Sequence, residues 1–267
     1  MALVKAKMLH SVYTNRYAFS PWVLDENMWK TYAWNETFVL YHKEDSLEEV
    51  KTLVTQREPC NIATHHHYDE DALERYFGWR HGAYKAGSPN VAILCTATVR
   101  TRTKGYIRVK VINLIGCAHD HQNQPDFKHY NTLNKIIGFY TRMWQLAFAA
   151  AKKSGCRKMR IYNVGGGVFA SVSNFEKTVF NKAFVPDPDI EILGWSPEKG
   201  FDGELVPNIL DKEDTDGILY VNAWDPWSIV GNGNAGDRSL DGAWGACSNM
   251  SVLCWPVTNP FIQYVSC

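Results

Sequence analysis

The alternation of hydrophobic and polar residues is clearest in the middle of the chain. Residues 91–100 (VAILCTATVR) are rich in β-branched and small side chains, and residues 106–116 (YIRVKVINLIG) alternate before they become wholly apolar. Both patterns predict strands of a sheet that is covered on its two faces. Residues 131–155 then carry apolar side chains at helical spacing and end in two lysines and a glycine, which predicts the clearest helix of the protein.

Shorter segments continue the alternation of strands and helices towards the C-terminus. Residues 156–164 (CRKMRIYNV) predict a strand that breaks into three consecutive glycines, and residues 173–184 (SNFEKTVFNKAF) predict a helix. Further strands are predicted at 190–195, 217–224 and 250–257. Strands that alternate with helices indicate the α/β class.

The first 89 residues are rich in aromatic side chains and show the least periodicity. A capping box predicts a helix at 46–56, and acidic residues at its start favour a second short helix at 69–84. We interpret residues 1–89 as an elaboration packed on a core formed by residues 90–267, within one compact domain.

Composition narrows the classes of partner. The 28 Lys and Arg residues balance the 28 Asp and Glu residues, so the chain has no bulk basic field for a nucleic-acid backbone. No window reaches about eighteen uninterrupted apolar residues, and the first residues lack the apolar core of a secretory signal. We therefore expect a cytoplasmic protein without membrane association. The seven cysteines are scattered without a CxxC pair and are expected to be mostly buried thiols.

Two glycine-containing loops suit a phosphorylated sugar as ligand. The loop from Val164 to Ala170 follows a predicted strand and leads towards a helix, an arrangement that turns backbone N–H groups onto phosphate oxygens. The loop from Val221 to Gly245 adds amides and carboxylates, which can hold ribose hydroxyls and position water during loss of a leaving group. A purely structural interpretation also exists, because glycines make tight turns and Asp237 could cap a helix.

Both loops resemble those of the macro domain, a family that binds ADP-ribose and in several branches removes it from proteins. The segment VNAWDPWSIVGNGN, followed by SLDGAWG, is similar to the family's first binding loop, where a strand ends in VNAAN before a glycine stretch and a GVDGAI-like helix start. The strand, helix, strand and glycine loop that end in VGGGVFAS resemble the family's other loop. The two loops come in the reverse of the family's usual order, so the resemblance implies a circular permutation.

The resemblance implies a macro-domain-like α/β fold: a mixed β-sheet flanked by helices in three α/β/α layers, beside the aromatic-rich N-terminal elaboration. It implies an ADP-ribosyl hydrolase that removes ADP-ribose from modified protein side chains, through a linkage to arginine or to a carboxylate, or alternatively a non-catalytic ADP-ribose reader. The expected catalytic residues are Asp225, Asp237 and Asp241. The expected ligand-binding residues are Asn222, Gly231, Asn232, Gly233, Asn234, Gly165, Gly166, Gly167, Val168 and Phe169. We expect a monomer without a metal site or an obligatory cofactor, although the carboxylates could hold Mg²⁺, and its partners would be ADP-ribose or ADP-ribosylated proteins.

Other classes of function have weaker support in the sequence. The histidines at 65–67 and 119–121 invite a zinc site, but three consecutive histidines cannot all face one metal, and no CxxC or HExxH motif accompanies them. We place His119, Asp120 and His121 only at the rim of a ligand site. No GxSxG or Walker A motif is present, and no GxGxxG motif follows a strand, which disfavours serine hydrolases, P-loop NTPases and nicotinamide-dependent dehydrogenases. A structural protein without a ligand is the third alternative.

Overall fold

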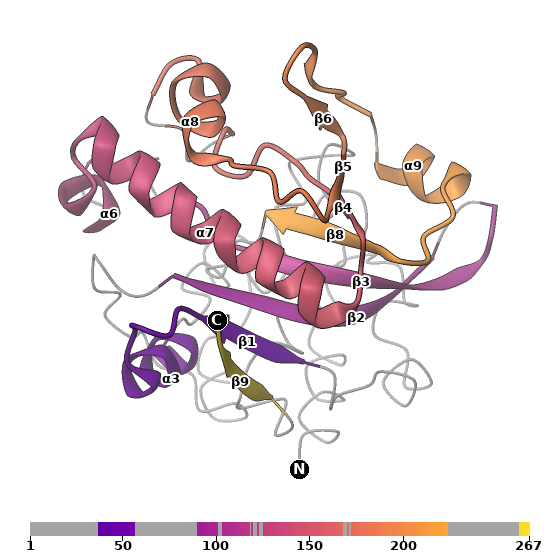
Figure 1. Cartoon of the computed structure of the whole chain (residues 1–267), viewed down its shortest axis with the longest axis horizontal. Coiled ribbons are helices and arrows are strands. Elements are labelled where there is room, and N and C mark those ends of the chain that lie inside the picture. The colour runs from indigo at the N-terminus through magenta and orange to yellow at the C-terminus, as the bar shows by residue number, and fades with distance from the viewer. Residues whose placement is uncertain are drawn as a thin grey trace, which may run out of the picture.

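The computed structural model describes residues 37–56, 90–100, 103–117, 119, 122, 125–167, 170, 172–204, 206–223 and 262–267. The predicted helix at 69–84 and the predicted strand at 250–257 lie outside these residues. The described residues form a mixed α/β fold in which helices pack on a central sheet (Figure 1).

The central sheet has seven strands, and one of them runs against all the others. The order across the sheet is β5 (Glu191–Leu193), β4 (Lys158–Arg160), β8 (Ile218–Ala223), β3 (Tyr106–Leu114), β2 (Val91–Arg100), β1 (Phe38–Tyr41) and β9 (Gln263–Ser266). Neighbouring strands are parallel from β5 to β3, antiparallel on both sides of β2, and parallel between β1 and β9. The sheet is therefore mixed, as expected, and β2, β3 and β8 confirm the strands predicted at 91–100, 106–116 and 217–224.

Strands β1 and β9 were not predicted, and they join distant parts of the chain. Strand β1 lies between β2 and β9 and pairs with both. The described part of the N-terminal segment therefore supplies an interior strand of the sheet. Helix α3 (Leu47–Gln56) follows and confirms the predicted helix at 46–56. It lies near β9, because the Lys51 ammonium is 5.8 Å from the centre of the Tyr264 ring.

Helix α7 (Leu133–Ser154) covers one face of the sheet and confirms the predicted helix at 131–155 (Figure 1). The Thr132 side chain caps its first turn, and Gly155 ends it in the left-handed region with a φ of 69°. Its buried side chains are Ile136, Phe139, Tyr140, Met143, Trp144, Leu146, Ala147, Phe148, Ala150 and Ala151. They pack against strand side chains such as Ile112, Met159 and Leu219, so the main core lies between α7 and the sheet.

A cluster of aromatic side chains extends this core from α7 to the segment at 180–184. The Phe184 ring stacks on Phe180 with centres 4.8 Å apart and meets Trp144 of α7 edge-on at 5.0 Å. The region predicted to be helical at 173–184 contains a π-helical turn followed by a short α-helix, so the prediction is confirmed in part. The remaining elements are α6 (Pro125–His129), the π-helical turn (Glu176–Phe180), α8 (Asn181–Ala183), β6 (Trp195–Ser196), β7 (Gly200–Phe201) and α9 (Val206–Lys212).

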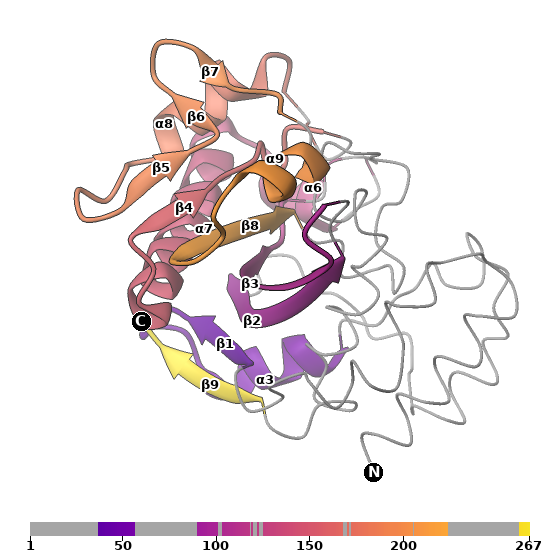
Figure 2. The ribbon, with the colours of Figure 1, turned by 90° about the vertical axis from the view of Figure 1, so that its right-hand side faces the viewer.

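Helix α9 lies beside β8 (Figure 2), and a charged network on the other face of the sheet lies next to it. Arg160 of β4 and Tyr220 of β8 are paired in register, and both contact Glu213, which follows α9. Arg160 also lies 3.0 Å from Asp202. Burial alone would lower the pKa of Arg160, but its hydrogen bonds to Glu213 and Asp202 outweigh that effect and raise the pKa. The guanidinium therefore stays charged and ties α9 to the sheet.

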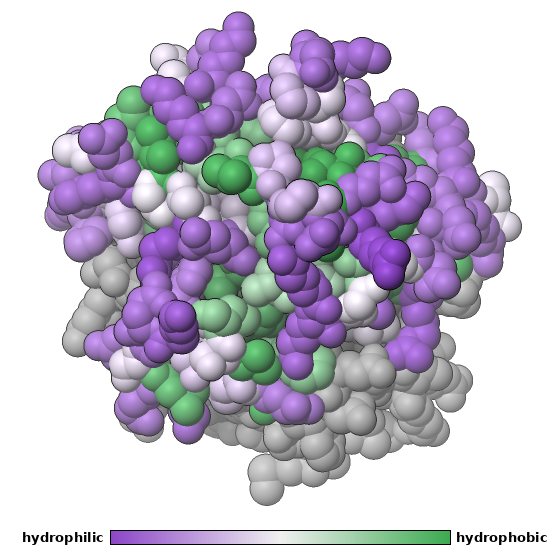
Figure 3. Space-filling view, in the orientation of Figure 1, coloured by the Kyte–Doolittle hydropathy of each residue, from purple (hydrophilic) through white to green (hydrophobic). Residues whose placement is uncertain are grey.

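The surface on the α7 side is mostly hydrophilic (Figure 3). Apolar residues are exposed on this side only in small areas between hydrophilic residues. Of the large apolar side chains in the described ranges, those with substantial exposure are Leu47, Phe127, Leu133 and Val185. None of the helices in these ranges is both long and apolar enough to cross a bilayer.

Candidate functional site

The candidate site lies at the carboxyl edge of the sheet, which we define as the ends of β3, β8 and β4 with Gly116–Cys117, Asn222–Ala223 and Asn163–Gly167. These three strands are neighbours and run parallel, so their carboxyl ends meet on one side of the sheet. The glycine loop leaves β4 there, and Val221–Ala223, the first residues of the second predicted loop, end β8 beside it. The fold thus brings the glycine loop close to the start of the second loop.

The glycine loop is a series of tight turns that leaves two backbone amides available. The Val164 N–H donates to the carbonyl of Tyr162 at 2.8 Å, and the Gly166 N–H donates to that of Asn163 at 3.1 Å. Within the described part of the loop, the N–H groups of Gly165 and Gly167 donate to no protein group. Gly167 is exposed and Gly165 is partly exposed. These two amides can therefore bind an anion, as backbone N–H groups at glycine loops commonly do.

One of the three glycines is required by the loop itself. Gly165 has a φ of 83°, in the left-handed region, and a Cβ atom there would lie 1.9 Å from the Tyr140 hydroxyl. A Cβ atom on Gly166 would lie 2.1 Å from the side chain of Asn163, but that side chain is exposed and can turn aside. Gly167 has nothing within 4 Å of such an atom, so steric demand does not explain it.

Asn222 is anchored at the end of β8. Its side chain is fully buried, and its Nδ2 donates to Oδ1 of Asn113 on β3 at 2.8 Å. Asn113 in turn donates to the carbonyl of Ile93 on β2 at 3.2 Å. The amides of Asn113 and Asn222 thus link three strands at the carboxyl edge. The side chain of Asn222 fixes the start of the second loop in this structure.

Cys117 and His119 lie close together at the carboxyl edge, but their geometry does not make them a nucleophile and its base. The His119 Nε2 is 3.3 Å from the Cys117 sulfur and 3.2 Å from the carbonyl oxygen of Asp126. A carbonyl only accepts and is a better acceptor than a thiol, so Nε2 carries its proton towards Asp126. Burial, together with the nearby Asp126 carboxylate, raises the pKa of the Cys117 thiol far above its ordinary value. The Cys117 thiol therefore stays protonated in this buried contact. His119, expected at the rim, is buried.

The other sequence-predicted residues fall outside the part of the chain that the structure describes. They are Val168, Phe169, Asp225, Gly231, Asn232, Gly233, Asn234, Asp237 and Asp241, with Asp120, His121 and the histidines at 65–67. Among the described residues, no group of three or more His, Cys, Asp or Glu side chains could hold a metal ion.

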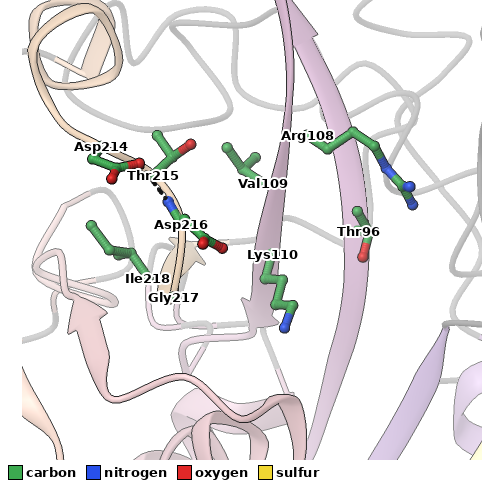
Figure 4. A pocket seen from close by; sticks show the side chains of 9 residues that line it. All are labelled: Thr96, Arg108, Val109, Lys110, Asp214, Thr215, Asp216, Gly217 and Ile218. Atoms are coloured by element: carbon green, nitrogen blue, oxygen red, sulfur yellow. Dashed lines mark hydrogen bonds between the residues drawn. The ribbon is translucent and has the colours of Figure 1, made fainter.

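A pocket of about 360 Å³ lies at the opposite end of β8 and does not join the carboxyl edge (Figure 4). Arg108 and Lys110 of β3 line it on one side, and the turn with Asp214 and Asp216 lines it on the other. Lys110 already donates to the carbonyl of Ser154 at the end of α7, at 2.6 Å. Cations and carboxylates therefore share the pocket, and it favours neither sign of charge.

Comparison with known proteins adds no family assignment. No model of a known protein family matches the chain, and no curated protein is significantly similar to it.

Proposed function

We propose that this chain binds ADP-ribose at the carboxyl edge and hydrolyses the bond between ADP-ribose and a modified protein side chain. The proposal rests on one observation: the glycine loop and the second loop (Val221 to Gly245) both begin at the carboxyl ends of neighbouring parallel strands. In open α/β sheets, ligands bind outside the carboxyl ends of the strands. The macro-domain resemblance of the two loops supplies the identity of the ligand.

Each loop has a separate part in binding. The amides of Gly165 and Gly167 hold the pyrophosphate, because they donate to no described protein group and belong to a partly exposed and an exposed residue, respectively. Asn222 anchors the start of the second loop through its bond to Asn113. Asn222 and Asn232 are the residues that we expect to orient the distal ribose. The remaining proposed ligand-binding residues are Gly166, Val168, Phe169, Gly231, Gly233 and Asn234.

The carboxylates of the second loop would perform the chemistry. Asp225 follows the end of β8 by two positions, and Asp237 and Asp241 come later in the same loop segment. One carboxylate takes a proton from water while the water oxygen bonds to the anomeric carbon of the ribose. The bond from that carbon to the protein side chain breaks, and the leaving group takes up a proton. The products are free ADP-ribose and an unmodified side chain. These carboxylates could also hold Mg²⁺, which an EDTA-treated sample would reveal.

Titration and turnover together test the proposal. We expect the purified chain to bind ADP-ribose in calorimetry and to release it from an ADP-ribosylated protein. The double variant Asp237→Ala/Asp241→Ala should keep binding and lose turnover. Asp214→Ala/Asp216→Ala is the matched control, because it removes two carboxylates at the opposite edge and should keep both activities.

The outcomes separate the hydrolase from the alternatives. Wild-type turnover by the double variant would overturn the proposed mechanism. Tight ADP-ribose binding without turnover on any ADP-ribosylated substrate would instead identify a reader. Absence of ADP-ribose binding would refute both and favour a protein that has no ligand at this edge.

A further inference from the structure

The hydroxyl of Tyr140 lies between the backbones of two loops at the carboxyl edge. Tyr140 projects from α7 and is only 1% exposed. Its oxygen accepts the Cys117 N–H at 3.0 Å, so it holds the segment that follows β3. The same oxygen is so close to Gly165 that a Cβ atom there would come within 1.9 Å of it. One phenol therefore contacts the loop after β3 and the glycine loop after β4.

These two loops also touch each other directly. A Cβ atom on Gly116 would lie 3.2 Å from the Cα of Gly165 and 3.2 Å from the Tyr140 oxygen. Such distances are tighter than ordinary van der Waals contact, so Gly116, Gly165 and the phenol have no spare room between them. The two backbones and the Tyr140 hydroxyl are therefore packed closely against one another.

The Tyr140 ring cannot easily move aside. The rings of Phe139 and Phe175 pack against it in edge-on geometry, with centres 5.2 Å and 5.0 Å away. Phe175 follows the glycine loop in sequence, so the ring is enclosed by the helix on one side and by the chain leaving the loop on the other. Burial raises the pKa of Tyr140 far above its ordinary value, so the group under the loop stays a neutral phenol. A neutral support adds no negative charge beneath a bound pyrophosphate.

We infer that Tyr140 is a positioning residue for the pyrophosphate of ADP-ribose: its hydroxyl fixes the Gly165–Gly167 backbone against Gly116–Cys117 in the arrangement that the ligand requires. This inference rests on the proposed function. It acts through the Gly165 and Gly167 amides, since the buried phenol itself does not reach the ligand. Tyr140→Phe keeps the ring, loses the hydrogen bond to Cys117 and frees the glycine loop to shift.

The test compares Tyr140→Phe with Tyr220→Phe by calorimetric titration with ADP-ribose. Both variants lose one hydrogen bond of a buried phenol, since Tyr220 donates to Glu213 at 3.1 Å on the other face of the sheet. We expect Tyr140→Phe to raise the Kd about tenfold, which corresponds to about 1.4 kcal/mol, while Tyr220→Phe stays within about twofold of wild type. A merely structural role would lower the binding-competent fraction, and hence the stoichiometry, and leave the Kd unchanged.

A second pair of variants probes the same spacing without removing a hydrogen bond. Gly116→Ala inserts a methyl group between the two loops, whereas Gly138→Ala on α7 meets nothing within 4 Å. We expect a raised Kd for Gly116→Ala and a wild-type Kd for Gly138→Ala. If the wild-type chain does not bind ADP-ribose, the proposed function fails. If it binds, and both Tyr140→Phe and Gly116→Ala bind with the wild-type Kd, the positioning role of Tyr140 is refuted while the proposed function stands.

Discussion

The hydrogen bond between Asn113 and Asn222 should appear as a measurable coupling free energy. Both side chains are fully buried, and the Nδ2 of Asn222 lies 2.8 Å from the Oδ1 of Asn113. Replacing Asn113 with Leu leaves a buried amide without this acceptor, which typically costs about 1–3 kcal/mol of unfolding free energy. Asn222→Leu should cost a similar amount. Leu is close to Asn in shape, so the double variant removes both polar groups with little change in packed volume.

The double variant should therefore cost less than the sum of the two single variants. Replacing both partners by apolar groups of similar shape is close to neutral, so we expect a coupling of about 2–3 kcal/mol, the upper part of the range for residues in contact. The assay is urea unfolding of all four proteins at one temperature, with the free energy taken from the midpoint and slope.

A control cycle pairs Asn113→Leu with Lys152→Ala, whose ion-pair partner is Asp187. These two positions share no partner, so their costs should add within about 0.3–0.5 kcal/mol. If the Asn113 and Asn222 variants are additive to the same extent, the hydrogen bond contributes no coupling. That result would refute the inference that Asn113 anchors the start of the second loop.

Three further perturbations test the fold around the site. Gly165→Ala combines a left-handed φ with a clash, and it should lower the unfolding free energy, measured by thermal unfolding, by about 2–4 kcal/mol. Gly167→Ala should change that free energy by less than about 0.5 kcal/mol in the same assay. Burial, and then the charge of the neighbouring arginine, lower the pKa of His42 in the folded state from its ordinary value of 6.5. The unfolded chain then takes up the proton first, so the unfolding free energy should fall as the pH drops through 6.5, and His42→Gln should flatten that slope in urea titrations. Arg160→Met leaves two partly exposed carboxylates without their cation and should cost about 2–3 kcal/mol by urea unfolding, whereas Lys158→Met removes an exposed ion pair and should cost less than about 1 kcal/mol.

The elements that could be predicted are those whose own sequence decides their structure. Helix α7 has a polar cap, an apolar stripe over several turns and a terminal glycine, and all three signals agree. Strands β2, β3 and β8 are continuous apolar or alternating runs. Strands β1 and β9 are only four residues long, and they pair with each other although they lie far apart in the sequence. No local pattern reports a partner from the other end of the chain.

The residues that shape the candidate site divide in the same way. The glycines of the loop could be found from sequence, because few other residues tolerate such backbone geometry. Asn113 left a weaker signal, as an amide within an otherwise apolar run. Tyr140 left none, since it occupies one of the regular apolar positions of α7 and only its hydroxyl sets it apart. The sequence pattern cannot distinguish such a residue from any other core residue, because its contacts with the two loops exist only in the folded structure.

The reversed order of the two loops does not weaken the case for a shared site. A sheet places loops by which strands are neighbours, and chain order enters only through the connections between them. Strands β4 and β8 pair in register and run parallel, so the glycine loop and the Asn222 loop leave the same edge whichever comes first in the sequence. Parallel β3 on the far side of β8 adds the Gly116–Cys117 backbone to that edge. A ligand that spans the ends of these strands would therefore meet the same three segments in either order.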